Sequence, residues 1–566
     1  MRGICKSVLA LFFLSAFPVI AFSQGGPHDL YIPQPAAGVF LNDLVMADSL
    51  PNGQRVDPLR VYVLQRGAIY QVRTAIINGN WALRIKAANT TGPKPAIFLI
   101  RNTVTNTNPG RMVTAGSDTT SLQNLVVVGY YEADPLLIGD MNGALITELT
   151  NSNGKIYVDS CVLSNTNGNH IRTDAAPSVI RVTNSIFANM GYCGTSNLGA
   201  GKAVDLRAGS CDSMIMVNNT FVNFQDRIIR HFGSTANIQF LRFEHNTLVN
   251  GMSYHGMLSL GRMGRRAVIS NNLLVDAFSL GNDSDAVRQA EFTDSGELDQ
   301  FGFPRMTWVI SNRNDTTVWT VKKNFFSISA SQQIFWDSAS ILPIVANPPL
   351  TPGSALTYNI NSRIGSDSTT AFARQDVALT NIPRLMTTFN KWYRRPSAQG
   401  GSGKTKVTTN FSAAFDFDRR IFFYFRDTLN CAYSTGSPLY TAALGGYPVG
   451  DLNWFPTRKH AWELDPVSGV GGPGSVEQPV AFELYQNYPN PFNPTTKISF
   501  NLERAGFTTL AVYNILGQKV ATVVAKELQA GLHNMSFDAS NLTTGVYFYR
   551  LESGKNFDVK KMMLLK

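Results

Sequence analysis

A repeated asparagine-centred segment occupies the middle of the chain and restricts the folds that this sequence can adopt. Six segments each place a small polar residue ahead of apolar residues, and their anchors are Ser160, Asn184, Asn219, Asn246, Asn272 and Asn324. Successive anchors are 24, 35, 27, 26 and 52 residues apart. The last interval fits two turns of the repeat, or one turn with a polar insertion. A spacing of roughly 25 residues with short strands in each repeat predicts a solenoid of stacked coils.

The repeat also predicts which side chains fill the solenoid. Asparagines at one turn position of successive coils can bond to each other and form a ladder, with coils about 4.8 Å apart. The apolar residues two positions later should stack inside: Val162, Ile186, Phe221, Leu248, Leu274 and Phe326. Leucine-rich repeats have a similar period, but their LxxLxLxxN consensus is missing from this sequence.

This pattern resembles the pectate-lyase-like superfamily of right-handed parallel β-helices, over residues 60–345. The resemblance implies an all-β main domain, which we expect to span residues 24–345 with its first coils near the N-terminus. Residues 346–465 are irregular in pattern and are predicted to form the end of the β-helix. Within them, residues 450–456 are the candidate cap over the last coil, because an exposed end would leave backbone groups unpaired.

The C-terminal region has a different character. A Gly/Pro/Ser linker at 466–478 precedes short alternating strands divided by Asn-Pro, Leu-Gly and Ser-Gly turns, which predict a small antiparallel Ig-like β-sandwich. The motifs YPNPFNPTT at 488–496, YNILGQKV at 513–520 and GVYFYRL at 545–551 resemble the type A sorting domain of type IX secretion substrates. The resemblance covers 479–566. It implies recognition by an outer-membrane translocon and a secreted or cell-surface location.

The N-terminus has the pattern of a signal peptide. Arg2 and Lys6 precede an apolar run at 8–22, and residues 21–23 place small side chains where a signal peptidase cleaves. We therefore expect residues 1–23 to be removed. No later apolar segment reaches spanning length, so no transmembrane segment is expected in the mature chain.

The net charge of +10 indicates a mild preference for anionic partners. For an exported protein we expect acidic polysaccharide and no nucleic acid, with simple solubility as the alternative explanation of the charge. No cysteine pair has CxxC spacing, which argues against a cysteine metal site. Cys193 and Cys211 flank a Gly-rich stretch and are the candidates for a disulfide.

An arginine follows each anchor by about ten residues in three coils, in the segments 170–173, 204–207 and 228–231. If Ile171, Leu206 and Ile229 face inward, strand alternation stacks Arg172, Arg207 and Arg230 in one outward column. Stacked like charges repel, so a bound acidic glycan would compensate for them. The alternative is a solvated row paired to Asp205 and Glu244.

The resemblance to β-helix polysaccharide lyases implies roles for these residues. Such enzymes use a Lys or Arg base on a lateral sheet to remove the proton next to a uronate carboxylate. The candidates for catalysis are Arg207 and Arg230, with Lys202 and His231 assisting, and those for substrate binding are Arg172, Asp205, Arg227 and Glu244.

Two functions stay open on the sequence. One is a polysaccharide lyase or a related carbohydrate-active enzyme, and the other is a glycan-binding adhesin or structural surface protein. Ca²⁺ is a cofactor to consider, but the sequence has no compact group of Asp and Glu ligands, so no metal site is predicted.

Overall fold

The computed structural model divides the chain into two compact units, residues 1–456 and 457–566, and each is described by itself. It describes residues 26–129, 144–149, 151–166, 168–173, 175–191, 199–207, 209–231, 236–280, 282–283, 307–308, 316–339, 346–347, 364–365, 368, 370–383, 386–399, 424–465, 482–487, 489–502, 506–528, 531–554 and 556–566. The predicted signal peptide and the linker at 466–478 lie outside these residues.

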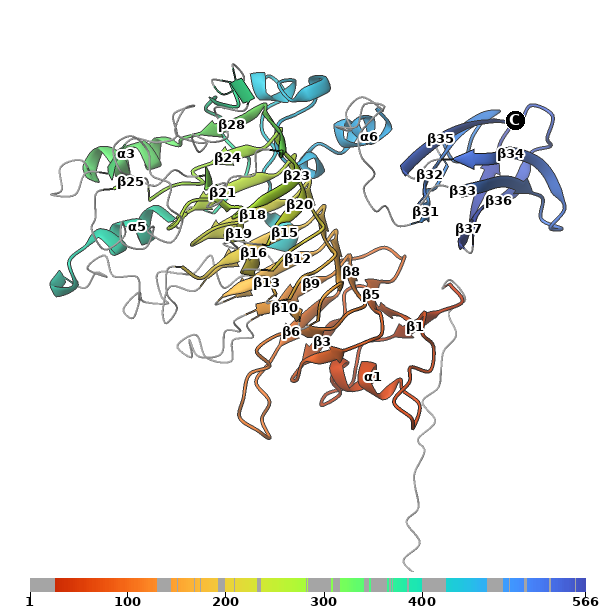
Figure 1. Cartoon of the computed structure of the whole chain (residues 1–566), viewed down its shortest axis with the longest axis horizontal. Coiled ribbons are helices and arrows are strands. Elements are labelled where there is room, and N and C mark those ends of the chain that lie inside the picture. The colour runs from red at the N-terminus through yellow and green to blue at the C-terminus, as the bar shows by residue number, and fades with distance from the viewer. Residues whose placement is uncertain are drawn as a thin grey trace, which may run out of the picture. The chain divides into compact units, whose positions relative to one another are not determined.

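The first unit is a parallel β-solenoid of three sheets, and each full coil adds one strand to each sheet (Figure 1). Sheet 1 contains β1 (Asp29–Ile32), β2 (Val61–Leu64), β5 (Leu83–Ala87), β8 (Thr119–Gln123), β11 (Lys155–Asp159), β14 (Val179–Thr183), β17 (Ser213–Val217), β20 (Ile238–Glu244), β23 (Met263–Ser270) and β27 (Val318–Lys322). Sheet 2 contains β3 (Ile69–Val72), β6 (Ala96–Leu99), β9 (Val126–Val128), β12 (Val162–Thr166), β15 (Ile186–Met190), β18 (Thr220–Phe224), β21 (Thr247–Gly251), β24 (Leu273–Val275), β28 (Asn324–Ser327) and β30 (Phe372–Arg374). Sheet 3 contains β4 (Ile76–Asn78), β7 (Val113–Ala115), β10 (Ala144–Leu149), β13 (Asn169–Thr173), β16 (Lys202–Arg207), β19 (Ile229–His231), β22 (Leu258–Ser259) and β26 (Thr307–Trp308).

The predicted asparagine ladder is present at the turn from sheet 1 to sheet 2. Asn219 Nδ2 donates to Asn246 Oδ1 (3.0 Å), Asn246 Nδ2 to Asn272 Oδ1 (3.1 Å), and Asn272 Nδ2 to Asn324 Oδ1 (2.8 Å). All four side chains are buried. Because every amide in the ladder is bonded on both sides, burial leaves few polar atoms unsatisfied.

The register of the two earlier anchors was predicted one residue too early. Ser160 and Asn184 have left-handed backbones, with φ of 55° and 54°, and the residue after each occupies the ladder position. Cys161 N donates to Ser185 Oγ (3.0 Å), and Ser185 N donates to Asn219 Oδ1 (3.0 Å).

The column of apolar side chains inside the solenoid is also one residue later than predicted in the first two of these coils. It runs through Leu163, Phe187, Phe221, Leu248, Leu274 and Phe326. The last four of these residues were predicted correctly. Val162 was predicted to lie inside, but it belongs to a separate cluster on sheet 2, and Ile186 packs against that cluster.

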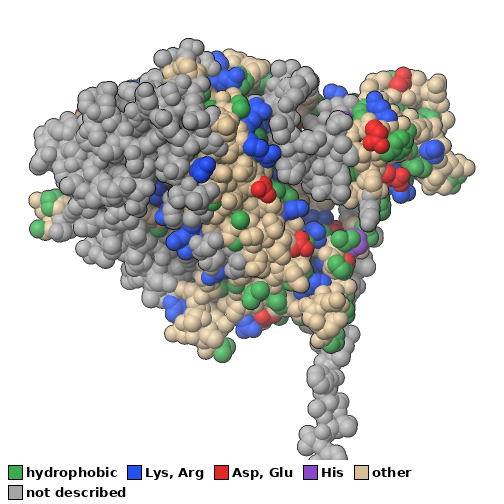
Figure 2. Space-filling view, in the orientation of Figure 1, with side chains coloured by type: hydrophobic (Ala, Val, Ile, Leu, Met, Phe, Trp, Pro, Cys, Tyr) green, Lys and Arg blue, Asp and Glu red, His purple; other side chains and the backbone are tan. Residues whose placement is uncertain are grey.

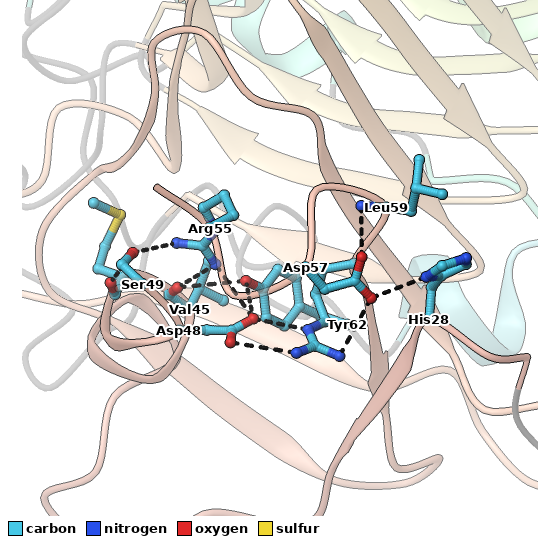
Figure 3. A network of polar contacts seen from close by, with 10 residues as sticks. His28, Val45, Asp48, Ser49, Arg55, Asp57, Leu59 and Tyr62 are labelled. Atoms are coloured by element: carbon cyan, nitrogen blue, oxygen red, sulfur yellow. Dashed lines mark hydrogen bonds and ion pairs between the residues drawn. The ribbon is translucent and has the colours of Figure 1, made fainter. Parts of the chain in front are cut away.

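A helix and a polar network close the start of the solenoid. Helix α1 (Leu41–Ala47) buries Leu41 and Val45 in the main core. Figure 3 shows how the following loop is held: Arg55 donates to Val45 O (2.7 Å), and Asp48 accepts from Arg60 Nε (2.9 Å) and Tyr62 Oη (3.0 Å).

Residues 424–455, here called the strap, run along the side of the coils. They contain the π-helical turn η6 (Tyr424–Thr428) and the 3₁₀ turns η7 (Pro438–Tyr440), η8 (Leu444–Gly446) and η9 (Leu452–Trp454). Phe425, Leu429 and Cys431 pack on a row of apolar side chains of sheet 2: Ala96, Phe98, Val126, Val128, Val162, Ala188, Val222 and Val249.

The predicted cap at 450–456 is therefore wrong. Asp451 bonds to Thr220 Oγ1 (2.8 Å) and Thr247 Oγ1 (2.8 Å), which belong to neighbouring inner coils. Gly450 has φ of 88°, and a Cβ there would lie 2.5 Å from Thr247 Oγ1. This close approach requires glycine, because any side chain would push the strap away.

Further short elements lie in the first unit. Helices α3 (Ala330–Ala339) and α5 (Met386–Arg394) both bond to Ser279, through Trp336 Nε1 (3.1 Å) and Asn390 Nδ2 (2.8 Å). The remaining elements are η3 (Ser397–Gln399) and the antiparallel pair β25 (Asn282–Asp283) and β29 (Ala346–Asn347).

The second unit confirms the predicted small antiparallel sandwich. Helix α6 (Pro456–Leu464) lies at the boundary between the units. One sheet contains β31 (Glu483–Leu484), β32 (Thr495–Leu502) and β35 (Gly531–Asp538); the other contains β33 (Gly506–Tyr513), β34 (Lys519–Leu528), β36 (Gly545–Ser553) and β37 (Asn556–Leu564). Phe500, Leu510 and Tyr549 are fully buried in their shared core. Among the residues that the structure describes, no helix has the length and hydrophobicity needed to cross a bilayer.

Candidate functional site

The outward row of sheet 3 alternates in charge, which corrects the predicted arginine column. Arg172 is aligned with Asp205, and Asp205 with Arg230. Arg207 is instead aligned with His231, after a register shift in the pairing of β16 and β19. Val204, and not Leu206, is aligned with Ile171 and Ile229. The carboxylate between two arginines removes the like-charge repulsion that had suggested a bound ligand.

Asp205 is held in place by its neighbours in the row. It accepts from Arg230 Nη1 (3.3 Å) and from Asn169 Nδ2 (3.2 Å), and its side chain is 2% exposed. The Arg230 side chain is 26% exposed, so it is accessible while paired. On the other side of the row, Arg172 is aligned with Glu148.

Three successive coils meet in a buried charged group, here called the Asp226 cluster, which consists of Lys202, Asp226, Arg227 and His255. Asp226 lies in the turn before β19 and accepts from Lys202 Nζ (3.0 Å), Arg227 Nε (3.2 Å) and His255 Nδ1 (2.8 Å). The backbone N–H of His255 also donates to it (3.1 Å). The four side chains are between 0% and 9% exposed.

Burial and charge act in opposite directions within this cluster. Burial alone would raise the pKa of Asp226, but Arg227, Lys202 and His255 outweigh it and hold that pKa well below its ordinary value. Burial lowers the pKa of Lys202, and Asp226 and Asp205 oppose the shift. Burial likewise lowers the pKa of Arg227. Asp226 is therefore a carboxylate whose four donors fix it in one position.

The structure brings together only some of the predicted site residues. Lys202 and Arg227 join the Asp226 cluster, and Arg172, Asp205 and Arg230 form the adjacent row. His231 is buried, with its Nδ1 at 2.8 Å from Leu260 O, and burial lowers its pKa. Glu244 lies on sheet 1, where it accepts from Arg242 Nε (2.7 Å). It therefore belongs to another part of the solenoid.

Asp226, His255 and Asn169 were not identified from the sequence. A signal for Asp226 exists: aligning coils on their inward residues places Val204 beside Ile229, so that Lys202 and Asp226 fall in adjacent turns.

No group of three or more metal-ligating side chains occurs in the described part of the chain. The Asp and Glu residues between positions 285 and 299 lie outside those residues. Cys211 is a buried free thiol, and its candidate disulfide partner Cys193 lies outside the described residues.

Four histidines of the solenoid are buried. His170, His231, His245 and His255 are all at most 4% exposed. His170 lies against Phe187 in the core, with ring centroids 5.2 Å apart, and burial lowers its pKa to about 3. A histidine so placed stays neutral in the folded state.

His170 should make the solenoid sensitive to acid. Its folded pKa lies below the unfolded value, so the unfolded state binds more protons and stability falls as the pH drops below about 6.5. Between pH 7.5 and pH 5, protonation of His170 in the unfolded state lowers the free energy of unfolding by about 2 kcal/mol. Over that interval, the free energy of unfolding of His170→Leu should fall by about 2 kcal/mol less than that of the wild type. Urea unfolding at each pH measures both. Parallel curves for the two proteins would contradict a neutral buried histidine.

Comparison with known proteins identifies the C-terminal unit. Residues 486–565 match the family described as the secretion system C-terminal sorting domain, which confirms the resemblance found in the sequence. No curated protein and no solved structure matches the chain. A domain of this family engages the outer-membrane translocon. The chain is therefore a type IX secretion substrate, exported across the outer membrane to a secreted or surface-attached location, in which a parallel β-solenoid precedes the sorting domain.

Proposed function

We propose that the solenoid binds an acidic polysaccharide outside the cell, on the outer side of sheet 3. The observation that supports this proposal is an excess of positive charge around the Asp226 cluster. Among the residues whose side chains are described, five cationic side chains (Arg172, Lys202, Arg207, Arg227 and Arg230) accompany two carboxylates (Asp205 and Asp226). Figure 2 shows the same bias over the visible described surface of the first unit, where Lys and Arg are more frequent than Asp and Glu.

Arginine suits this ligand because its planar guanidinium binds a carboxylate through two parallel hydrogen bonds. Adjacent coils are about 4.8 Å apart, so arginines two coils apart in the row are separated by about 10 Å. An extended glycan that carries an acid on alternate sugars could meet both. The resemblance to pectate-lyase-like β-helices supports the same ligand class.

The proposal predicts weaker binding when the accessible arginines are removed. Arg172→Ala/Arg230→Ala in the full chain should bind polygalacturonate at least roughly tenfold more weakly than the wild type, since a hydrogen bond to a charged group contributes about 1.5–3 kcal/mol. Added salt should weaken the wild type as well. Isothermal titration calorimetry at low and high salt gives both results.

Arg181→Ala provides a matched control. Arg181 is half-buried on sheet 1 and makes no ion pair within the described residues. Its loss should leave binding unchanged. If Arg181→Ala weakens binding and the double variant does not, the glycan binds sheet 1 and the proposed site is wrong.

A polysaccharide lyase is the second candidate. It is favoured by Lys202, because burial lowers its pKa in the direction that a general base requires. The Lys202 side chain is nevertheless only 3% exposed and is paired to Asp226, so the geometry supports binding better than proton abstraction. Incubation with uronate polymers, followed by absorbance of the unsaturated product, separates the two. Product formation that is lost in Lys202→Met but retained in Arg181→Ala would favour the enzyme.

A further inference from the structure

The turn between β33 and β34 of the sorting domain displays two aliphatic side chains. Ile515 and Leu516 are 71% and 76% exposed. The turn is braced from within: Asn514 Oδ1 accepts from Leu516 N (3.0 Å) and Gln518 N (3.0 Å), and Asn514 Nδ2 donates to Gln518 Oε1 (2.8 Å). Rigid display of large apolar groups is unfavourable in water, so this arrangement marks a contact surface.

The apolar tip continues onto the outer face of the four-stranded sheet. Tyr513 is aligned with Lys519 on one side and with Phe548 on the other, and Phe548 is aligned with Lys561. Opposite residues of an antiparallel pair share a face. Phe548 is 37% exposed, whereas its neighbour Tyr549 is buried in the core. These four residues with Ile515 and Leu516 form what is here called the tip surface.

The charges beside the tip surface define its partner. The side chains of Lys519 and Lys561 are exposed and make no ion pair in the part of the chain that is described. An apolar centre with a cationic rim is complementary to an apolar groove lined with carboxylates. A sorting domain engages the translocon, so one protein partner for this unit is already implied.

We propose that the tip surface is the part of the sorting domain that docks into an apolar, acid-rimmed groove of a translocon protein. The aliphatic pair enters the groove and the two lysines pair with its rim. A lipid surface and a second copy of this chain are the competing occupants. The proposal is independent of what the solenoid binds.

The test is export of the full chain in a bacterium that carries a type IX system. Ile515→Ser/Leu516→Ser should lower the surface-exposed fraction at least tenfold and cause periplasmic accumulation, as should deletion of residues 479–566. Ile515→Val/Leu516→Met keeps the apolar surface and should be exported normally. Val104→Ser is the matched control, because Val104 is an 83% exposed aliphatic residue in another asparagine-braced turn. Protease shaving of whole cells measures the exposed fraction.

A second variant, in which the two lysines are reversed in charge, keeps the proposal testable if the Ser variant fails to fold. Lys519→Glu/Lys561→Glu should also lower surface display, with an unchanged melting temperature of the purified chain. Normal display of both the Ser variant and the Glu variant would overturn the proposal. Normal display together with tip-dependent sedimentation on phosphatidylglycerol vesicles would assign the surface to lipid, and tip-dependent dimerisation in sedimentation velocity would assign it to a second copy.

Discussion

Replacing Asn246 by leucine is expected to lower the free energy of unfolding of the solenoid by about 3–6 kcal/mol. Its Oδ1 accepts from Asn219 N (3.1 Å) and Asn219 Nδ2 (3.0 Å), and its Nδ2 donates to Met216 O (2.9 Å) and Asn272 Oδ1 (3.1 Å). Leucine replaces none of these side-chain hydrogen bonds, although Asn272 Oδ1 still accepts from the backbone N–H at position 246 (2.9 Å). Each unpaired group costs about 1–3 kcal/mol, reduced by whatever relaxation the turn allows. Urea unfolding of the purified chain measures the change.

Position within the ladder should determine the size of the effect. Ser185→Ala removes the hydroxyl that accepts from Cys161 N (3.0 Å) and donates to Thr183 O (2.7 Å), so a smaller loss of about 1–2 kcal/mol is expected. Asn52→Leu in an exposed turn is the control and should change stability by less than about 0.5 kcal/mol. Equal midpoints for Asn246→Leu and Asn52→Leu would argue against a stabilising ladder.

The second large effect is expected at Asp226. Asp226→Leu removes the carboxylate between Lys202 and Arg227 and leaves both cations buried without their compensating charge. Breaking a buried ion pair in this way typically costs about 3–5 kcal/mol. Because the pKa of Asp226 is held well below its ordinary value, its stabilisation is present above about pH 4 and is lost as the pH falls through the folded pKa. The difference from wild type should therefore shrink in strong acid.

Two comparisons isolate the charge effect at Asp226. Arg374→Ala breaks the exposed pair with Asp376 (2.9 Å) and should cost at most about 1 kcal/mol. Adding Lys202→Met to Asp226→Leu removes one stranded cation and should recover part of the loss. A double variant less stable than Asp226→Leu would show that Lys202 contributes by packing more than by charge.

The parts of the fold that repeat could be predicted, and the parts that occur once could not. Asn219, Asn246, Asn272 and Asn324 occupy one turn position, so their spacing revealed both the period and the ladder. The sorting domain was recognisable because its turns carry Asn-Pro and Leu-Gly signals. The strap is not part of a coil. Because its contacts join residues that are far apart in the chain, they produce no repeated sequence pattern from which its position could be predicted.

Errors of one residue arose where the backbone departs from simple alternation. Asn184 takes the left-handed conformation and Ser185 occupies the ladder, although asparagine is common at both positions. Arg207 also has a left-handed backbone, with φ of 51°, and the register shifts there. Counting every second residue through such a point assigns side chains to the wrong face. Asp226 was missed because it lies in a turn, where alternation gives no information.

The position of the strap in the chain determines when, during folding, the apolar face of sheet 2 is covered. The apolar row of sheet 2 extends from Ala96 to Val249, but Phe425, Leu429 and Cys431, which cover it, come much later in the chain. During synthesis and refolding, therefore, coils that are already stacked still carry an uncovered apolar strip. A chain that ends before residue 424 would present this strip to other chains, and association through it would compete with native folding.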